Sequence, residues 1–320
     1  MLTAGDMENR QTGPTMYFLG VSTNQSVSRK IFPRWVEILG IRQARLVGID
    51  LPIDAPAGQY RRVMYHIKID PMIRGALVTT HKLNLLRAAE DFFDELTPDA
   101  ALCREVSSIY KRNGRLIGHT VDPTTCGQAM QRFIPPDHWS CHGADLLCLG
   151  AGGAAVALVY FFCSRAPANW KPKRIMLIDR DRAKLDNIRY LLTKLPSSEI
   201  DFGFTHNADP AINDRLLASL PAHSVVINAT GMGKDRPGSP ITDQAVFPES
   251  GIVWELNYRG KLDFLHQARS QAVDRNLRIE DGWDFFLLGW SAIVGNVFDL
   301  RIGPQTFEKL CATARELRSD

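Results

Sequence analysis

A glycine-rich turn, Gly-Ala-Gly-Gly-Ala-Ala at residues 150–155, directly follows an apolar run at 145–149. Gly150, Gly152 and Ala155 match the G-x-G-x-x-G/A pattern of dinucleotide-binding turns. The first glycine permits a tight turn, the second lets the backbone approach a pyrophosphate, and the small third residue lets helix and strand pack closely. The N-terminus of the next helix then offers N–H groups and a positive dipole end to the phosphates. We predict a cofactor site at Gly150, Ala151, Gly152, Gly153 and Ala154.

A charged turn, Asp179-Arg180-Asp181, ends the next predicted strand, where the adenosine ribose of a dinucleotide would lie. A carboxylate there hydrogen-bonds the ribose hydroxyls and repels a 2′-phosphate, whereas Arg180, Arg182 and Lys184 would attract one. The balance favours NAD, because a carboxylate against a phosphate is costly while an arginine can point into solvent; NADP stays possible. Two other interpretations stay open: a solvated charged turn, and a methyltransferase, which also uses a glycine-rich turn with a ribose-binding acid.

The cysteines are scattered, without a Cys-x-x-Cys pair, and several lie in apolar contexts. Such cysteines are usually buried thiols, and none has metal-ligand spacing with other residues. We therefore predict no metal site. The six positions are Cys103, Cys126, Cys141, Cys148, Cys163 and Cys311.

The elements that would carry these residues alternate between strand and helix. The first third of the chain predicts strands at 16–19, 44–49 and 76–79 and helices at 26–41 and 82–93. Pro33 is expected in the first turn of its helix, because deeper in the helix it would remove a hydrogen bond. Asn113-Gly114 favours a two-residue hairpin turn between strands at 106–110 and 115–118.

A second α/β region begins near residue 123. Its strongly apolar strands alternate with helices, which indicates a parallel, doubly wound sheet of the Rossmann type. We predict strands at 145–149, 174–178, 224–227 and 252–255, and helices at 154–164, 183–195, 285–300 and 304–318.

The length of 320 residues is about twice that of a usual domain and predicts two domains. We expect an N-terminal α/β substrate domain at 1–122, completed by C-terminal helices at 281–320, and a dinucleotide-binding domain at 123–280. The fold class is therefore α/β with two domains.

Composition and charge argue against several kinds of partner. The formal net charge of +3 is spread along the chain without a block of like charges, so nucleic acid is not expected. The first fifteen residues lack an apolar run of signal-peptide length, and no segment approaches ~20 apolar residues. We expect a cytoplasmic protein with no membrane association, as a monomer or homodimer.

Several segments, in order, resemble the shikimate/quinate dehydrogenase family. Ser26-Val-Ser28 resembles its early Ser-x-Ser, and the segment ending at His81-Lys82 resembles its Asn-Val-Thr-x-Pro-His/Phe-Lys. Asp122 is similar to the Asp of Gly-Asp-Asn-Thr-Asp. Residues 227–230 match a strand end followed by Asn-Ala-Thr, and Tyr258 and Asp281-Gly282 fall where that family has a Tyr near Lys-Thr-Pro and its C-terminal Asp-Gly.

The resemblance implies roles for these positions. Lys82 and Asp122 would be the catalytic pair beside a substrate hydroxyl, the lysine accepting or returning the proton and the carboxylate orienting it. Ser26 and Ser28 would hold a substrate carboxylate. The cofactor set would extend to Asn228, Ala229 and Thr230.

Departures from the family pattern concern the residues that read a polyol ring. Ala76 and Val78 stand where the family has Asn and Thr, Ser107 replaces an Asn, and Gly289 stands in place of a Gln. A site built to pair hydroxyls loses affinity when its partners become apolar, so shikimate itself is not expected. Ser107 remains a candidate substrate contact, and Trp290 and Tyr258 are candidates to border the substrate. His81 and His119 flank the catalytic pair and are candidates to replace a lost polar contact.

These observations predict an NAD(P)-dependent oxidoreductase of the shikimate/quinate dehydrogenase type. It would transfer hydride between a nicotinamide cofactor, NAD or NADP, and a hydroxy or oxo carboxylic acid. The alternative is a non-catalytic nucleotide-binding regulatory protein of the same fold, motivated by the altered substrate motifs.

Overall fold

A computed structural model describes residues 11–196, 198–234 and 236–318. The chain divides into two compact units. Unit 1 comprises Met1–Val121 and Gly289–Asp320, and unit 2 comprises Asp122–Leu288. Residues 281–288 therefore fall in unit 2. The first ten residues, which belong to the stretch where no signal peptide is expected, lie outside the described residues.

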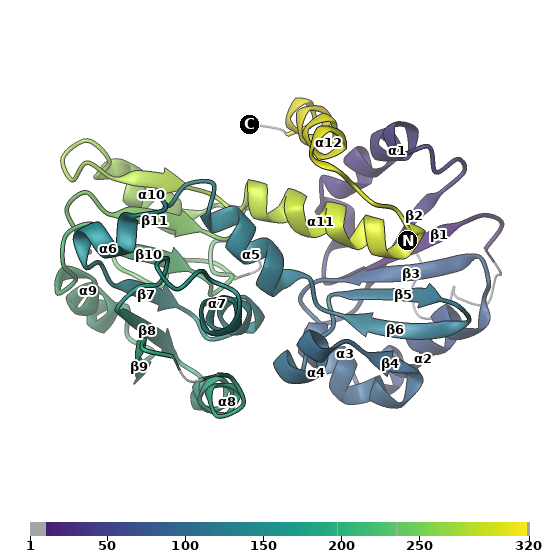
Figure 1. Ribbon diagram of the computed structural model, residues 1–320, viewed down its shortest axis with the longest axis horizontal. Coiled ribbons are helices and arrows are strands. Elements are labelled where there is room, and N and C mark those ends of the chain that lie inside the picture. Colours follow the sequence, from purple (N-terminus) through teal and green to yellow (C-terminus); the bar gives the residue numbers. More distant parts are fainter. Residues whose placement is uncertain (1–10, 197, 235, 319–320) are drawn as a thin grey trace. The chain divides into compact units, whose positions relative to one another are not determined.

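Unit 1 is built on a sheet with the strand order β2-β1-β3-β5-β6-β4 (Figure 1). β1 pairs in parallel with β2 and β3, β5 is antiparallel to both β3 and β6, and β4 is parallel to β6. The strands are β1 (Thr15–Gly20), β2 (Arg45–Asp50), β3 (Ile73–Val78), β4 (Glu95–Leu96), β5 (Ser108–Arg112) and β6 (Arg115–His119).

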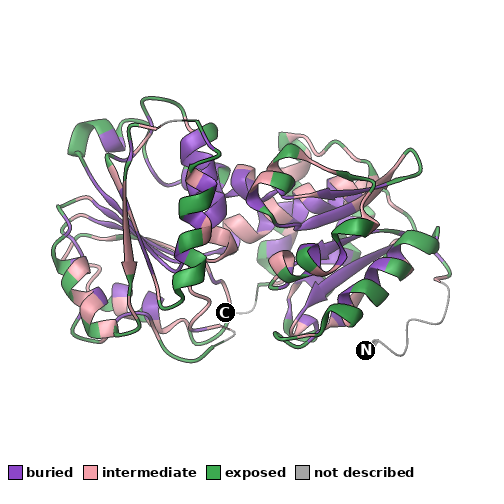
Figure 2. Ribbon diagram, turned by 90° about the horizontal axis from the view of Figure 1, so that it is seen from below, coloured by how far each residue is buried: buried purple, intermediate pink, exposed green. Residues whose placement is uncertain are grey.

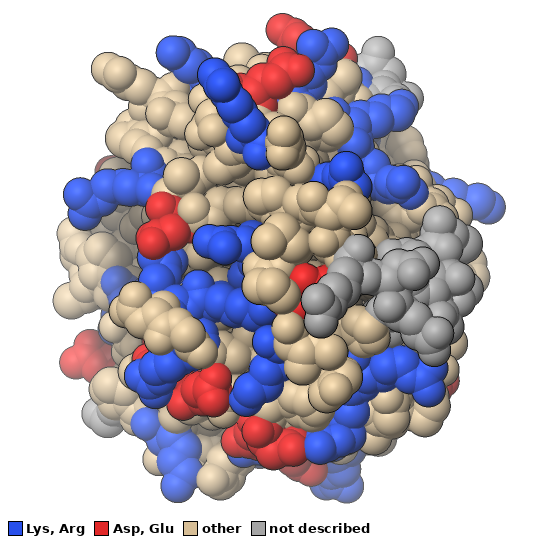
Figure 3. Space-filling view, turned by 90° about the vertical axis from the view of Figure 1, so that its right-hand side faces the viewer, with Lys and Arg blue, Asp and Glu red and all other residues tan. Residues whose placement is uncertain are grey.

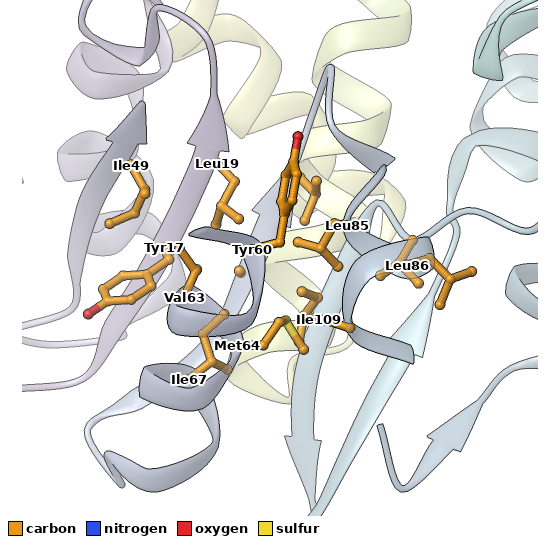
Figure 4. Close-up of a cluster of buried hydrophobic side chains, with 14 of the residues drawn as sticks. Tyr17, Leu19, Ile49, Tyr60, Val63, Met64, Ile67, Leu85, Leu86 and Ile109 are labelled. Atoms are coloured by element: carbon orange, nitrogen blue, oxygen red, sulfur yellow. The ribbon is translucent and has the colours of Figure 1, made fainter. Parts of the chain in front are cut away.

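The helices of unit 1 bury apolar side chains against this sheet. Figure 4 shows a buried cluster in which residues of α2 and α3 pack onto β1, β2, β3 and β5. The helices are α1 (Ser28–Leu39), α2 (Ala57–Ile69), α3 (Lys82–Ala89), α4 (Pro98–Cys103) and α12 (Pro304–Glu316), with 3-10 turns η2 (Thr23–Gln25) and η3 (Glu90–Phe92). α1 and α12 lie together, and the Trp35 indole N–H donates to the Leu310 carbonyl at 3.1 Å.

Pro33 lies deeper in its helix than the sequence predicts, because α1 begins at Ser28 and places the proline at its sixth residue. The expectation of a first-turn proline was wrong. Proline in a helix leaves the carbonyl four residues earlier without its usual donor. Both Pro33 and Arg29 are exposed, so water can serve that carbonyl.

The predicted hairpin is confirmed. β5 and β6 pair in register from Ser108 opposite His119 to Arg112 opposite Arg115. Asn113 and Gly114 have φ of 51° and 75°. These positive angles at both central positions are those that the two-residue hairpin turn requires.

Unit 2 contains a fully parallel sheet with the order β12-β11-β10-β7-β8-β9 (Figure 1). Counted along the chain, this is the 3-2-1-4-5-6 order of the doubly wound dinucleotide-binding fold. The predicted α/β fold class is confirmed. The strands are β7 (Leu146–Leu149), β8 (Arg174–Asp179), β9 (Asp201–His206), β10 (Val225–Asn228), β11 (Ile252–Glu255) and β12 (Arg278–Glu280).

Helix α7, which follows the glycine turn, is buried along almost its whole length, and Figure 2 shows the central strands buried as well. α7 packs on α5, where a Cβ on Gly127 would come within 2.0 Å of the Phe161 ring. Gly127 thus permits this close approach. The helices are α5 (Asp122–Met130), α6 (His138–His142), α7 (Gly153–Ser164), α8 (Arg182–Leu192), α9 (Pro210–Ala218) and α10 (Asp263–Ser270); α11 (Trp283–Phe298) crosses the boundary between the units.

On the face in Figure 3, lysine and arginine side chains are interspersed with aspartate and glutamate. Surface ion pairs of unit 1 include Arg61 with Asp91 and Arg115 with Glu95. Within the described ranges, no helix is long and apolar enough to cross a membrane. The same ranges contain no cluster of three or more His, Cys, Asp or Glu side chains that could hold a metal ion.

Candidate functional site

The glycine turn lies where the direction of chain winding reverses in the unit 2 sheet. β7 and β10 are neighbours, but from β7 the chain proceeds to β8 on one side and from β10 to β11 on the other. The connections that leave the carboxyl ends of two such strands diverge and open a crevice, which is where doubly wound sheets bind ligands. Residues 150–152 follow β7, and residues 229–232 follow β10.

The backbone at Gly150 requires glycine. Its φ is +107°, and a Cβ there would lie 2.8 Å from the Ala229 carbonyl carbon. Gly152 is the extended residue that precedes α7, and among the described residues no side chain caps this helix. The amide groups at its N-terminus therefore suit an anion such as a pyrophosphate.

Asp179, at the end of β8, is hydrogen-bonded to the glycine turn. One carboxylate oxygen accepts the Ala151 N–H at 2.8 Å, and the other accepts the Asp181 N–H at 2.9 Å. The Lys184 ammonium lies 3.9 Å from the same carboxylate. The negative charge of Asp179 is thus engaged by two amides and one cation, while Asp181 caps α8 through the Ala183 N–H.

A pocket of about 180 Å³ opens beside this turn and is lined by residues that follow β7, β8, β9 and β10. Gly150, Gly152, Asp179, Ala229 and Thr230 contribute to its wall. Its wall also includes three cations, which are Arg180, Lys184 and Arg236. The pocket wall thus carries three cations and one carboxylate, and that carboxylate is already hydrogen-bonded. This balance of charge favours a ligand with several negative charges.

Arg236 and Asn213 also line this pocket, and the sequence did not predict them as site residues. Asn213 accepts a hydrogen bond from Asn207 at 2.8 Å and donates to the Pro240 carbonyl at 2.7 Å. Neither residue belongs to a motif, and only the strand order brings them to the glycine turn. Cys148, in β7 just before the turn, is fully buried, and burial raises the pKa of its thiol to about 12.

In unit 1, several predicted residues lie at the same end of the central strands of the sheet. β1 and β3 run parallel and end there at Gly20 and Val78, while the antiparallel β5 begins there and β6 ends there. Lys82, at the start of α3, follows β3 directly, and its carbonyl accepts the Val106 N–H. Ser107 precedes β5, and its hydroxyl accepts the Val121 N–H at 3.0 Å.

The two serines of the Ser-x-Ser segment lie together in this unit. Ser26 and Ser28 are both buried, with their hydroxyl oxygens 2.5 Å apart. This bond uses one of the two O–H groups as its donor. Nearby in the sequence, the Thr23 N–H donates to Asp50 at 2.8 Å and fixes the turn that leads into this segment.

The remaining predicted residues are divided between the units. Asp122 is buried as the first residue of α5 and of unit 2. Tyr258, in unit 2, packs on the rings of Trp283 and Phe286. Trp290, in unit 1, is 6% exposed and meets Phe18 edge-on at 5.3 Å, so most of its surface already serves packing.

His81 is a buried residue of unit 1 with both ring nitrogens hydrogen-bonded. Nδ1 lies 2.9 Å from the Tyr60 hydroxyl and Nε2 lies 3.1 Å from the Leu51 carbonyl. A carbonyl only accepts, so Nε2 carries the proton and Nδ1 accepts from Tyr60. Burial lowers the pKa of His81. His119 is half-buried, with Nδ1 2.9 Å from the Thr97 hydroxyl.

Ala76 and Val78 belong to the buried hydrophobic cluster of unit 1, at 0% and 1% exposure. Their side chains supply packing against α2 and α3. At these two positions the chain therefore presents no hydrogen-bonding side chain to a ligand.

Comparison with known proteins supports the resemblance seen in the sequence. No family model matches the chain. The shikimate dehydrogenase (NADP⁺) of Lactococcus lactis subsp. cremoris is 29% identical over 184 residues, covering 57% of this chain and 60% of that protein. The chain thus matches about 60% of the length of that curated relative. The resemblance to shikimate dehydrogenases is confirmed.

Solved structures share the fold over nearly the whole chain. Shikimate 5-dehydrogenase from Thermus thermophilus, in complex with NADP(H) and shikimate, has a TM-score of 0.66 at 20% identity, with 94% of this chain and 99% of that chain covered. The 5-ketofructose reductase of Gluconobacter sp. strain CHM43 has a TM-score of 0.66 at 18% identity, with 97% and 100% covered. At these identities the likeness concerns the fold alone.

Proposed function

We propose that this chain is an NADP(H)-dependent oxidoreductase of the shikimate dehydrogenase type that acts on a hydroxy or oxo carboxylic acid other than shikimate. The observation that carries the proposal is the pocket beside the glycine turn. It lies at the carboxyl ends of β7 and β10 and is lined by Arg180, Lys184 and Arg236.

The charges in this pocket favour NADP over NAD. A 2′-phosphate would meet the three cations, whereas the Asp179 carboxylate, which led us to expect NAD from the sequence, already accepts two backbone amides. Hydrogen bonds that involve charged groups contribute about 1.5–3 kcal/mol each. The similar dehydrogenase of Lactococcus lactis is named for NADP⁺, which points in the same direction.

In the proposed reaction, Lys82 and Asp122 handle the proton. When the substrate alcohol is oxidised, its carbon loses a hydride and its hydroxyl loses a proton. A bound nicotinamide would accept the hydride, and the Lys82 amine in its neutral form would take the proton and become an ammonium ion. The Asp122 carboxylate would accept a hydrogen bond that orients the hydroxyl or the ammonium. In the reverse direction, Lys82 returns the proton to the oxygen as the carbonyl is reduced.

The substrate class follows from the serines and from the apolar positions. One hydroxyl of the Ser26–Ser28 pair can donate a hydrogen bond to a carboxylate, and the buried Ala76 and Val78 offer nothing to ring hydroxyls. A carboxylic acid with few hydroxyl groups satisfies both conditions. The altered positions also motivate the alternative, a nucleotide-binding protein without catalysis.

A cofactor and substrate survey tests the proposal. The purified protein would be titrated with NADPH and NADH and then assayed for hydride transfer with a panel of hydroxy and oxo acids that includes shikimate and quinate. We expect NADPH to bind more tightly and at least one acid other than shikimate to be turned over. Lys82→Ala should lower the rate about 10²–10⁴-fold with cofactor affinity unchanged.

Other outcomes would identify a different function. NADPH binding without turnover of any acid would support the non-catalytic alternative. Tight binding of S-adenosylmethionine without binding of either dinucleotide would instead indicate a methyltransferase. Undiminished hydride transfer in Lys82→Ala would refute the role of the lysine.

A further inference from the structure

Glu255 is a buried carboxylate that no sequence motif singles out. It ends β11, next to the end of β10, and is 0% exposed. In the part of the chain that the structure describes, no lysine, arginine or histidine forms an ion pair with it. The charged group that affects its pKa is another acid, Asp281, which raises that pKa. A buried carboxylate needs hydrogen-bond donors in place of water. Its donors are two asparagines.

One carboxylate oxygen controls the orientation of Asn228. The Asn228 Nδ2 donates to Glu255 Oε2 at 2.6 Å, so the amide oxygen of Asn228 points the other way. That oxygen accepts the Thr230 N–H at 3.1 Å and the Thr230 hydroxyl at 2.7 Å. The Thr230 hydroxyl in turn accepts the Met232 N–H at 3.1 Å. Glu255 therefore fixes the Asn228 amide with its oxygen toward the loop at 229–232.

The other carboxylate oxygen controls Asn257. It accepts the Asn257 backbone N–H at 2.8 Å and the Asn257 Nδ2 at 2.6 Å. The same Nδ2 donates to the Met232 carbonyl at 3.2 Å. Both ends of the short loop after β10 are thus tied to one carboxylate, through Asn228 at one end and Asn257 at the other.

This loop forms part of the dinucleotide pocket. Ala229, Thr230 and Met232 line it, and the Ala229 carbonyl approaches Gly150 so closely that the glycine cannot carry a side chain. A shift of the loop would therefore change both the pocket wall and the support of the glycine turn.

We propose that Glu255 is a positioning residue for the dinucleotide, which acts by holding Asn228 and Asn257 in the orientations that shape the 229–232 loop. The proposal rests on the proposed function, because the pocket is assigned to the cofactor there. Glu255 touches no cofactor in this scheme and acts only through its two asparagines.

The hydrogen-bond pattern suggests an exchange of side chains that tests this role. Three N–H donors point at Glu255, one at Oε2 and two at Oε1. In Glu255→Gln, the new NH₂ group must face at least one of these donors, whichever way the amide turns. Combining it with Asn228→Asp removes the single donor at Oε2, so the glutamine can donate to the new aspartate and still accept from Asn257. The double variant keeps the charge and every bond of the network.

The experiment measures NADPH and NADH affinity by titration of the full chain, together with hydrogen exchange of the Thr230 and Met232 amides without cofactor. We expect Glu255→Gln to bind NADPH roughly 5- to 100-fold more weakly, because a buried donor is left without an acceptor. Exchange at both amides should rise. The double variant should return to within about threefold of the wild-type affinity and restore slow exchange. Glu249→Gln, at an exposed glutamate paired with Arg275 in the same unit, is the matched control and should change neither.

The outcomes separate this proposal from the proposed function. If the wild-type protein binds neither dinucleotide, both are overturned. If it binds NADPH but Glu255→Gln binds equally well, or the amides of Thr230 and Met232 exchange no faster, only the role of Glu255 is overturned. Should Glu255→Gln fail to fold, the double variant decides: a folded double variant with wild-type affinity supports the positioning role, and a folded one with weak affinity refutes it.

Discussion

At the scale of single residues, Arg180 offers the simplest test of cofactor choice. It is exposed, lines the dinucleotide pocket and directly follows Asp179. If a 2′-phosphate binds there, Arg180→Ala should raise the NADPH dissociation constant about 10- to 100-fold, since the variant loses a charge-assisted hydrogen bond. NADH affinity should change little. Isothermal titration with both cofactors measures the difference.

The control for this prediction lies on the neighbouring helix. Arg189, on α8, pairs with Asp186 and lies over the Phe204 ring, outside the pocket lining. Arg189→Ala should leave both affinities unchanged. A wild-type protein that prefers NADH, with Arg180→Ala equal to it, would show instead that Asp179 decides the choice, as the sequence alone suggests.

His81 illustrates a residue whose type suggests chemistry but whose surroundings serve stability. Its neutral ring donates to Leu51 and accepts from Tyr60, and burial holds its pKa below the ordinary value. The unfolded chain therefore binds the proton first as the pH falls. The stability that depends on the neutral ring is complete above pH ~6.5 and decreases as the pH drops below it.

We expect His81→Leu to lower the free energy of unfolding by about 1–3 kcal/mol at pH 8, because the Tyr60 hydroxyl and the Leu51 carbonyl lose their hydrogen bonds to the ring. The variant should also lose less stability than the wild type between pH 7 and pH 5. Urea unfolding at several pH values measures both effects, and the other histidines cancel in the difference. Parallel pH profiles for the two proteins would contradict the assignment of this titration to His81.

At the scale of elements, the sequence predicted the strands and helices whose apolar spacing is strong. β7, the glycine turn and α7 were predicted nearly to the residue, because an apolar strand, two glycines and a small residue follow one another without interruption. β4 and β12 were missed since they contain only two and three residues. β9 is an edge strand without a fully buried residue, so it lacks the apolar signal of its neighbours.

Helix α2 was also not predicted, although its sequence carries a clear signal. Its buried residues Tyr60, Val63, Met64 and Ile67 stand at helical spacing, which the sequence-based assignment passed over. The candidate site divides similarly. The glycine turn is contiguous and was predictable, whereas Arg236, Asn213 and Glu255 approach it only through the strand order, which no local pattern specifies.

Packing between α5 and α7 provides a prediction at this scale. A Cβ at Gly127 would lie 2.0–2.5 Å from three atoms of the buried Phe161 ring, so the ring or one of the two helices must move. We expect Gly127→Ala to destabilise the protein by about 1–3 kcal/mol, the usual range for overpacking, even though alanine favours helix. Gly58→Ala, in α2 with open space around the position, is the control and should be neutral or slightly stabilising. Equal denaturation midpoints for the two variants would refute the tight packing.

At the scale of the whole molecule, the division into two units means that a ligand of one sheet need not order the other. The proposed cofactor residues that follow β7, β8 and β10 all belong to unit 2, and those proposed to bind the carboxylate, Ser26 and Ser28, belong to unit 1. A ligand that binds only the native state stabilises it by about 2.7 kcal/mol at 100 times its dissociation constant. This stabilisation should be concentrated where the ligand makes its contacts.

Hydrogen–deuterium exchange of the full chain with saturating NADPH tests this expectation. Peptides that cover residues 149–156, 178–184, 228–234 and 236–240 should exchange more slowly, because these segments contribute residues to the pocket wall. Peptides that cover β1 and β3, which form the buried centre of the other sheet, should keep their rates, since no proposed cofactor contact lies there. Protection confined to unit 1 would contradict the assignment of the pocket. Equal protection of both sheets would mean instead that the units unfold as one cooperative body, so that binding in either stabilises the whole.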